Sequence, residues 1–322
     1  MTIDTMTTSA APSTPSPTGG VERLRAAAAG AVLRRVAGPD PAQARARVHA
    51  APGPRWFDPD SPIGRVHGDA SMFVGGIRAL LLQSLHPRAM AAVAAHSGYR
   101  GDPWGRLQRT ATFLATTTFG PAEDAARAVA IVRAVHARVS GTTSQGEPYE
   151  ASDPHLVRWV HLAEVDSFLL AHQRLGARPL SDEECDEYVA QVAVVGHALG
   201  AAPLPTTLAG LHEALGAYRP ELRGTTEARE AAAFLLRTPP LPAPARPVYG
   251  LLAAGGVALM PAWTRSELGL RYRPRVDAAL GRPGGRVATR AIRWALSSVP
   301  PARLDHPEVV PPAGPDRAGA LR

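Results

Sequence analysis

His136 is the residue whose type and position are best suited to holding a metal or a cofactor. Apolar side chains recur at helical spacing around it, at Ala125, Val129, Val132 and Val139, so the histidine shares their face. An imidazole on such a face has to be hydrogen-bonded or metal-bound, because an unpaired polar group is costly to bury. The pattern therefore predicts either a metal or haem ligand or a core histidine bonded to a carbonyl.

Two further residues could support a group held by His136. Arg133 lies one turn earlier on the same side of the predicted helix, where a guanidinium can pair with an anion such as a haem propionate. His161 falls on another apolar stripe, with Val157 and Val165 at helical spacing. It could be a distal or outer group of the same site, although a hydrogen-bonded structural histidine is the more common outcome for such a position.

A mixed face precedes this region, with Arg106, Thr110, Phe113 and Thr117 at helical spacing and Arg109 beside them. Its cations could pair with propionates, and its hydroxyl could donate a hydrogen bond to iron-bound dioxygen. A solvated arginine edge with threonines at packing positions explains the same pattern. The spacing alone leaves both interpretations open.

Other catalytic motifs are missing from the sequence. His86 and His96 are ten residues apart, which does not place them on adjoining turns as a ligand pair. There is no HExxH or paired ExxH motif, no GxSxG elbow, no glycine-rich phosphate loop and no kinase signature. Local motifs therefore give little support to a zinc or di-iron site, a hydrolase or a nucleotide-dependent enzyme.

The elements that must position these residues are predicted to be helices, because a period of three to four residues dominates and no series of alternating strands is present. Four signals mark helix starts: Asp102-Pro103, Gly120-Pro121, Asp153-Pro154, and Ser181 with Glu184 as a capping box. The helix that begins at Gly120-Pro121 is expected to run to Gly141, and the segment from 141 to 153 to form a turn or small hairpin.

Further helices are expected at 22–37, 70–84, 87–96, 206–217, 226–237, 248–260 and 284–298. We predict an all-α protein in which a multi-helix bundle of residues 21–298 forms one domain. Residues 1–20 are predicted to be a disordered tail, and residues 299–322 a flexible proline-rich tail.

The composition of the chain limits which binding partners and which cellular compartment we expect. The chain has no lysine, so its 35 basic residues are all arginine, against 28 acids and a net charge of +7. They are scattered among the acids, which argues against a nucleic-acid partner.

The single Cys185 excludes an internal disulfide. The first twenty residues show no export signal, and the apolar run 248–263 is interrupted and shorter than the roughly 18 residues of a membrane span. We expect a cytoplasmic protein without an integral membrane span.

Short motifs follow one another in order from about Trp56 to Tyr272. They are Arg65-Val66-His67-Gly68-Asp69-Ala70, Leu85-His86-Pro87 with His96-Ser97, Asp102-Pro103-Trp104-Gly105-Arg106-Leu107-Gln108-Arg109-Thr110, Thr118-Phe119-Gly120, Arg133-Ala134-Val135-His136, Gly141, Asp153-Pro154, Arg158-Trp159-Val160-His161, Val165-Asp166-Ser167-Phe168 and Leu259-Met260-Pro261-Ala262-Trp263-Thr264-Arg265. The ordered series resembles that of the latex-clearing-protein and MpaB-type oxygenase family.

The resemblance implies a bundle of helices around a b-type haem. Characterised members of the family cleave carbon–carbon double bonds of polyisoprene with dioxygen or act on terpenoid side chains. The family's proximal histidine and the arginine before it correspond to His136 and Arg133, and its arginine and threonine four residues apart correspond to Arg106 and Thr110. The expected haem ligand is His136, and the expected surrounding groups are Arg133, Arg109 and Phe113 at the cofactor and Arg106, Thr110 and His161 on the catalytic side.

One departure from the family concerns the distal side, where the rubber-cleaving members use a lysine that can cap the iron. This chain has no lysine. With no export signal either, we expect dioxygen and a hydrophobic small molecule as substrates, olefinic or terpenoid-like, rather than an extracellular polymer. Two alternatives are a non-catalytic haem-binding sensor or carrier on the same fold and a haem-free helical partner protein. The sequence does not indicate an oligomeric state.

Overall fold

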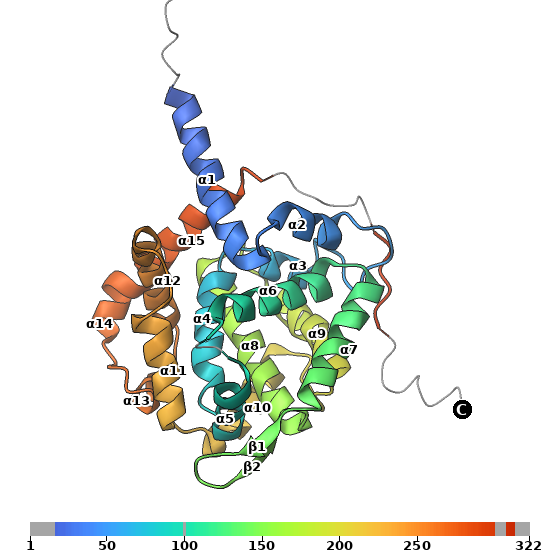
Figure 1. The fold of residues 1–322 in the computed structure, drawn as a ribbon, viewed down its shortest axis with the longest axis vertical. Coiled ribbons are helices and arrows are strands. Elements are labelled where there is room, and N and C mark those ends of the chain that lie inside the picture. The colour runs from blue at the N-terminus through green and yellow to red at the C-terminus, as the bar shows by residue number, and fades with distance from the viewer. Residues whose placement is uncertain (1–16, 99–100, 300–306, 313–322) are drawn as a thin grey trace, which may run out of the picture.

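The computed structural model describes residues 17–98, 101–299 and 307–312, and helices make up nearly all of its regular structure (Figure 1). The predicted all-α fold is confirmed. The first half of the chain forms α1 (Pro17–Ala37), α2 (Pro41–His49), α3 (Pro62–His67), α4 (Met72–Gln83), α5 (Pro87–His96), α6 (Pro103–Phe119), α7 (Ala122–His136), β1 (Ser140–Thr142) and β2 (Pro148–Glu150). The second half forms α8 (Pro154–Leu175), α9 (Asp182–Leu199), α10 (Leu208–Ala217), η1 (Arg219–Glu221), α11 (Thr226–Arg237), η2 (Ala243–Ala245), α12 (Arg246–Ala258), α13 (Ala262–Glu267), α14 (Pro274–Val276), η3 (Asp277–Gly281) and α15 (Arg282–Leu296).

The helix starts lie where the capping signals predicted them. The Asp102 side chain accepts a hydrogen bond from the Gly105 N–H at the start of α6. Asp153 caps α8 in the same way, and Ser181 and Glu184 form both hydrogen bonds of a capping box at α9. These side chains satisfy amide groups that have no partner within the first turn.

The central contact of the bundle joins α4 and α8, which lie side by side in the middle of Figure 1. Gly75 allows this approach, because a Cβ atom at this position would lie 2.9 Å from the Cδ1 atom of Phe168. α12 packs against α4 and against α15, and its Gly255 faces Gly285 so closely that a Cβ atom would meet the Cα atom of Gly285 at 3.0 Å. The core is therefore built from helices that nearly touch at glycines.

The connection between α7 and α8 contains the hairpin that was predicted there. β1 and β2 pair antiparallel, with Ser140 opposite Glu150 and Thr142 opposite Pro148. Gly146 lies in the turn with a φ of 83°, a conformation that glycine adopts readily. The hairpin begins before Gly141, so α7 ends at His136 rather than at the expected residue 141.

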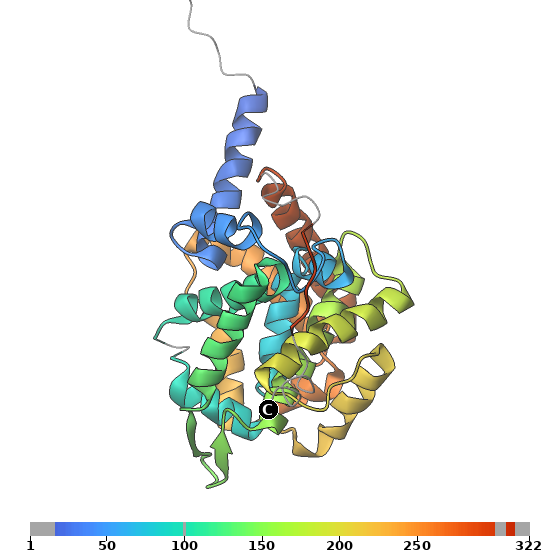
Figure 2. The ribbon, with the colours of Figure 1, turned by 90° about the vertical axis from the view of Figure 1, so that its right-hand side faces the viewer.

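Both expected tails differ in part from the prediction. α1 begins at Pro17, so residues 17–20 belong to a helix that projects from the bundle (Figure 1, Figure 2). Residues 1–16 lie outside the described residues. Of the C-terminal segment, residues 307–312 are described, and Arg55 exchanges backbone hydrogen bonds there with Glu308 and Val310 at 2.7 Å each. These backbone hydrogen bonds join part of the C-terminal segment to Arg55, and the flexibility of residues 299–322 stays a prediction.

Within the described residues, the helices are too short or too polar for any of them to cross a membrane.

Candidate functional site

His136 is the last residue of α7, and its side chain is half-buried. Burial lowers the pKa of the imidazole below its usual value, because removal from water disfavours the charged form. Among the described residues, the ring has no hydrogen-bond partner. His136 is therefore a neutral imidazole whose nitrogen atoms are free to bind a ligand.

The apolar stripe of α7 is covered unevenly. Ala125 and Val129, near the start of the helix, are buried, whereas Val132, His136 and Val139 are only partly covered. The predicted shared face is present, but His136 lies at its more open end rather than in the middle of a closed interface. This end of α7 presents accessible apolar surface beside a free imidazole.

The burial of the predicted site face of α6 also decreases along the helix, away from Gly120. Thr117 is buried, and Phe113 is partly buried and packs against the core. Arg106 is partly covered, and Thr110 is exposed. α6 and α7 are thus both tightly packed where Gly120 joins them and more open toward their far ends.

The polar groups of α6 bind their near neighbours. Arg106 donates from Nη1 to the Ser97 hydroxyl at 2.7 Å, and Arg109 donates to the Asp102 carboxylate at 3.3 Å. The Thr110 hydroxyl donates to the Arg106 carbonyl at 3.0 Å within the helix. None of these three hydrogen bonds reaches His136, so α6 presents its predicted site residues as a separate polar surface.

The last turn of α9 brings together residues from α7 and α8. Arg133 donates from Nη1 to the Ala198 carbonyl at 3.2 Å. The His161 ring lies against Gly196, where a Cβ atom would meet the ring carbon Cε1 at 2.7 Å. Burial first, and the neighbouring His197 second, lower the pKa of His161 to about 4. His161 is therefore neutral at pH 7 and lies near the helix that contacts Arg133.

Glu164 is a residue at this junction that sequence reasoning missed. It follows His161 by one turn of α8, and burial raises its pKa to about 7. Among the described residues, its carboxyl group has no hydrogen-bond partner. A carboxyl group with such a pKa can hold or release a proton near neutral pH. The signal in the sequence was an acid three residues after His161, on the same side of the helix.

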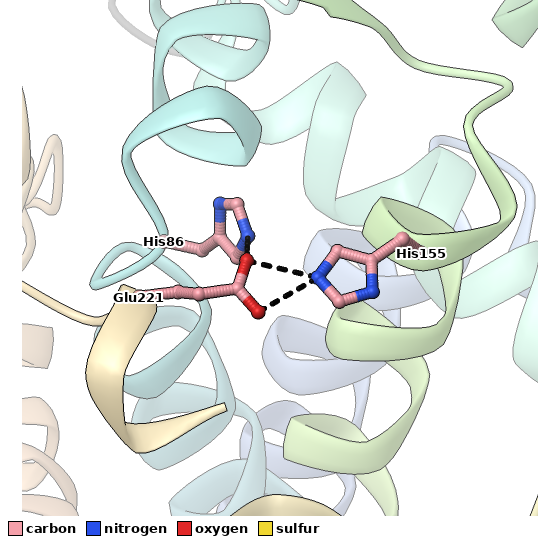
Figure 3. Close-up of side chains that lie close together, drawn as sticks. All are labelled: His86, His155 and Glu221. Atoms are coloured by element: carbon pink, nitrogen blue, oxygen red, sulfur yellow. Dashed lines mark hydrogen bonds and ion pairs between the residues drawn. The ribbon is translucent and has the colours of Figure 1, made fainter. Parts of the chain in front are cut away.

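A second cluster lies at another place in the fold and consists of His86, His155 and Glu221 (Figure 3). The Nε2 atom of His155 is 2.9 Å from both carboxylate oxygens of Glu221. The Nε2 atom of His86 is 3.3 Å from Oε2 of the same carboxylate. His96, which the sequence analysis compared with His86, is exposed and contacts the Tyr149 hydroxyl instead. His86 thus finds its partners far away in the sequence, where local spacing gave no signal.

A comparison with models of protein families matches residues 64–294 to the family described as ER-bound oxygenase mpaB/B'/Rubber oxygenase, catalytic domain. The matched stretch runs from α3 into α15 and includes every predicted site residue. No curated protein and no solved structure matches the chain. Because the match covers most of the sequence and agrees with its ordered motifs, the chain belongs to the mpaB and rubber oxygenase catalytic-domain family.

Proposed function

We propose that this protein is a haem-b-dependent oxygenase that acts on a hydrophobic small molecule of olefinic or terpenoid type, with His136 as the protein ligand to the iron. Membership of the family supports oxygenase chemistry. The observation that carries the haem assignment is the partner-free, neutral imidazole of His136 at the open end of the α7 stripe.

Side chains of α6 and α7 are of the types that hold a haem group. A neutral imidazole nitrogen is a common axial ligand to haem iron, and the lowered pKa keeps His136 in that form at pH 7. The partly covered Val132 and Phe113 offer apolar surface to a porphyrin face. Arg133 and Arg109, which both lie near the surface, could pair with propionates. When bound, haem would supply the redox chemistry with dioxygen.

We assign Arg106, Thr110 and His161 to the substrate side, as the resemblance to the family implies. His161 is neutral at pH 7 and presents ring nitrogens that have no hydrogen-bond partner among the described residues. Glu164, one turn away, can hold a proton on its carboxyl group near pH 7. Glu164 could accept or donate a proton beside a bound substrate near pH 7, whereas the neutral His161 ring could accept or donate a hydrogen bond there.

Absorption spectroscopy of haem-supplemented protein tests the iron ligand. We expect a Soret band for the wild type and for the control His212→Ala, which removes an exposed histidine on α10. His136→Ala should abolish or greatly weaken the band, and His136→Gly should regain it when free imidazole is added. An unchanged band in His136→Ala would show that another residue holds the iron.

Activity and haem content together separate the oxygenase from its two alternatives. An oxygenase consumes dioxygen in proportion to the cleavage of an olefin. Haem-loaded protein that consumes no dioxygen with a panel of hydrophobic olefins would be a sensor or carrier. Folded wild-type protein without a Soret band after supplementation would be a haem-free partner protein.

A further inference from the structure

Three residues from separate parts of the chain direct their side chains to one point (Figure 3). His86 precedes α5, His155 lies in the first turn of α8, and Glu221 ends η1. The candidate ligand atoms, one from each residue, all lie within 4.8 Å of one another. None of these residues belongs to the proposed haem site, so the cluster needs its own explanation.

The hydrogen bonds of Tyr218 indicate which nitrogen of His155 carries a proton. The Tyr218 hydroxyl donates to the His155 carbonyl at 2.9 Å. The hydroxyl has only one proton, and this bond uses it. In the 3.3 Å contact between the hydroxyl and Nδ1 of His155, Nδ1 must therefore be the donor. In a neutral ring this leaves Nε2 without a proton. The Nε2 lone pair therefore points at the Glu221 carboxylate, whose oxygens are also electron-rich.

A positive charge at the centre, from a metal ion or a second proton on His155, would remove the repulsion between these lone pairs. His86 is almost completely buried, and its Nδ1 atom has no partner among the described residues. Two neutral imidazoles and one carboxylate form a donor set that zinc and other divalent transition metals bind in proteins.

The distances fit metal coordination. Zinc–nitrogen and zinc–oxygen bonds of about 2.0–2.2 Å place neighbouring ligands of a tetrahedral ion about 3.3 Å apart. The Oε2 atom of Glu221 lies 2.9 Å from Nε2 of His155 and 3.3 Å from Nε2 of His86, so both ligand pairs have a spacing close to this value. His86 is 2% exposed, whereas the side chains of His155 and Glu221 are 41% and 37% exposed. An ion can therefore enter from the solvent side and keep a water molecule there.

Arg88 is a nearby positive charge that would oppose a bound cation. Arg88 lies 3.9 Å from Glu221, but its guanidinium also faces the Asp153 carboxylate at 3.6 Å. The positive charge of Arg88 is thus shared with an acid outside the cluster. Its repulsion of a metal ion is reduced accordingly.

We propose that His86, His155 and Glu221 bind one divalent transition-metal ion through the Nε2 atoms of both histidines and a carboxylate oxygen, with a remaining position for water. The ion connects the segment before α5, the start of α8 and η1. It is separate from the proposed haem and requires no haem to bind. The competing occupant of the same space is a second proton on His155.

Zinc binding to the full-length, tag-free protein tests the site. After treatment with a chelator, wild type, His155→Ala, Glu221→Gln and the control His212→Ala are titrated with zinc chloride by calorimetry, and bound zinc is measured after dialysis. We expect one equivalent in wild type and in the control, with a rise in the thermal unfolding midpoint. His155→Ala and Glu221→Gln should each weaken binding by more than about 100-fold, because even loss of an outer partner of a metal ligand costs about 10- to 100-fold.

The exposed positions of His155 and Glu221 make both variants suitable for this test, and circular dichroism confirms their folding. Metal analysis of protein purified without chelator identifies the natural ion. One equivalent of zinc, iron or manganese that both substitutions remove supports the site. No zinc binding in wild type, or binding that survives either substitution, overturns it. The Soret band of His155→Ala should match the wild type, so failure of this site and failure of the haem proposal give different results.

Discussion

Arg78 of α4 and Asp166 of α8 form an ion pair in the protein interior, with 2.7 Å between Nη2 and Oδ2. Arg78 also donates from Nη1 to the Ser167 hydroxyl at 2.7 Å and from Nε to the Leu259 carbonyl at 3.1 Å. The guanidinium therefore joins α4, α8 and the end of α12 at the centre of the bundle. Asp166 and Ser167 belong to one of the family-like motifs, and their contacts give that motif a structural role.

Removal of this arginine should destabilise the fold strongly. Arg78→Met leaves the Asp166 carboxylate, which is only 13% exposed, without its guanidinium partner and with only the exposed His212 ring at 3.7 Å. Breaking a buried pair costs about 3–5 kcal/mol. Urea unfolding of the two proteins measures the difference. Arg127→Met is the control, because Arg127 and Glu123 form an exposed pair worth less than about 1 kcal/mol. An equal decrease in the free energy of unfolding of Arg78→Met and Arg127→Met would contradict a special role for the interior ion pair.

Two adjacent glycines of α4 should respond to alanine in opposite directions. A Cβ atom on Gly75 would lie 2.9 Å from a ring carbon of Phe168 and 3.2 Å from its Cα atom, so Gly75→Ala should lower the free energy of unfolding by about 1–3 kcal/mol. A Cβ atom on Gly76 meets nothing within 4 Å. Gly76→Ala should therefore be neutral or stabilise by up to about 1 kcal/mol. Chemical denaturation measures the free energy of unfolding of both variants. A larger decrease in Gly76→Ala than in Gly75→Ala would show that α4 and α8 pack differently.

Glu164 should make stability fall as the pH rises from 4.5 to 7. Its pKa is about 7 in the folded protein against an ordinary value of 4.5, so the folded state holds a proton that the unfolded state releases in this range. The free energy of unfolding of the wild type, relative to that of Glu164→Gln, is then highest below pH 4.5. This difference should fall by about 2 kcal/mol by pH 7 to 8, after allowance for the partial exposure of Glu164. Unfolding curves between pH 4 and 8 measure this difference. A difference that does not vary with pH would contradict the raised pKa.

His67 should destabilise the protein in acid. Burial first, and His172 second, lower its pKa from 6.5 to about 3, so between these values the unfolded state binds a proton that the folded state does not. Stability is complete above pH 6.5 and decreases as the pH falls toward 3. His67→Gln can still contact the Thr118 and Tyr188 hydroxyls, which His67 contacts at 2.8 and 3.3 Å, but it carries no charge. The wild type should lose about 3 kcal/mol relative to this variant between pH 7 and 4. Parallel stability curves in acid would exclude a buried neutral His67.

The sequence by itself determined the helical class, most helix starts and the family. Helical periodicity is a local property, and caps such as Asp102 and Ser181 act within one turn, so both can be recognised without knowledge of the fold. The same periodicity placed His136 on an apolar face and Arg133 one turn before it. The order of the motifs then predicted the family that the comparison confirms.

Only the tertiary structure decided how these residues are covered and what lies beside them. It shows that α7 ends at His136, that Thr110 is exposed and that Arg133 contacts the end of α9. The raised pKa of Glu164 likewise depends on the tertiary structure, because its cause is the burial of the carboxyl group in the folded protein. His86, His155 and Glu221 are 69 and 66 residues apart along the chain, so their meeting depends on the packing of distant segments. Burial and convergence of this kind are properties of the assembled bundle, and no local pattern of residues contains them.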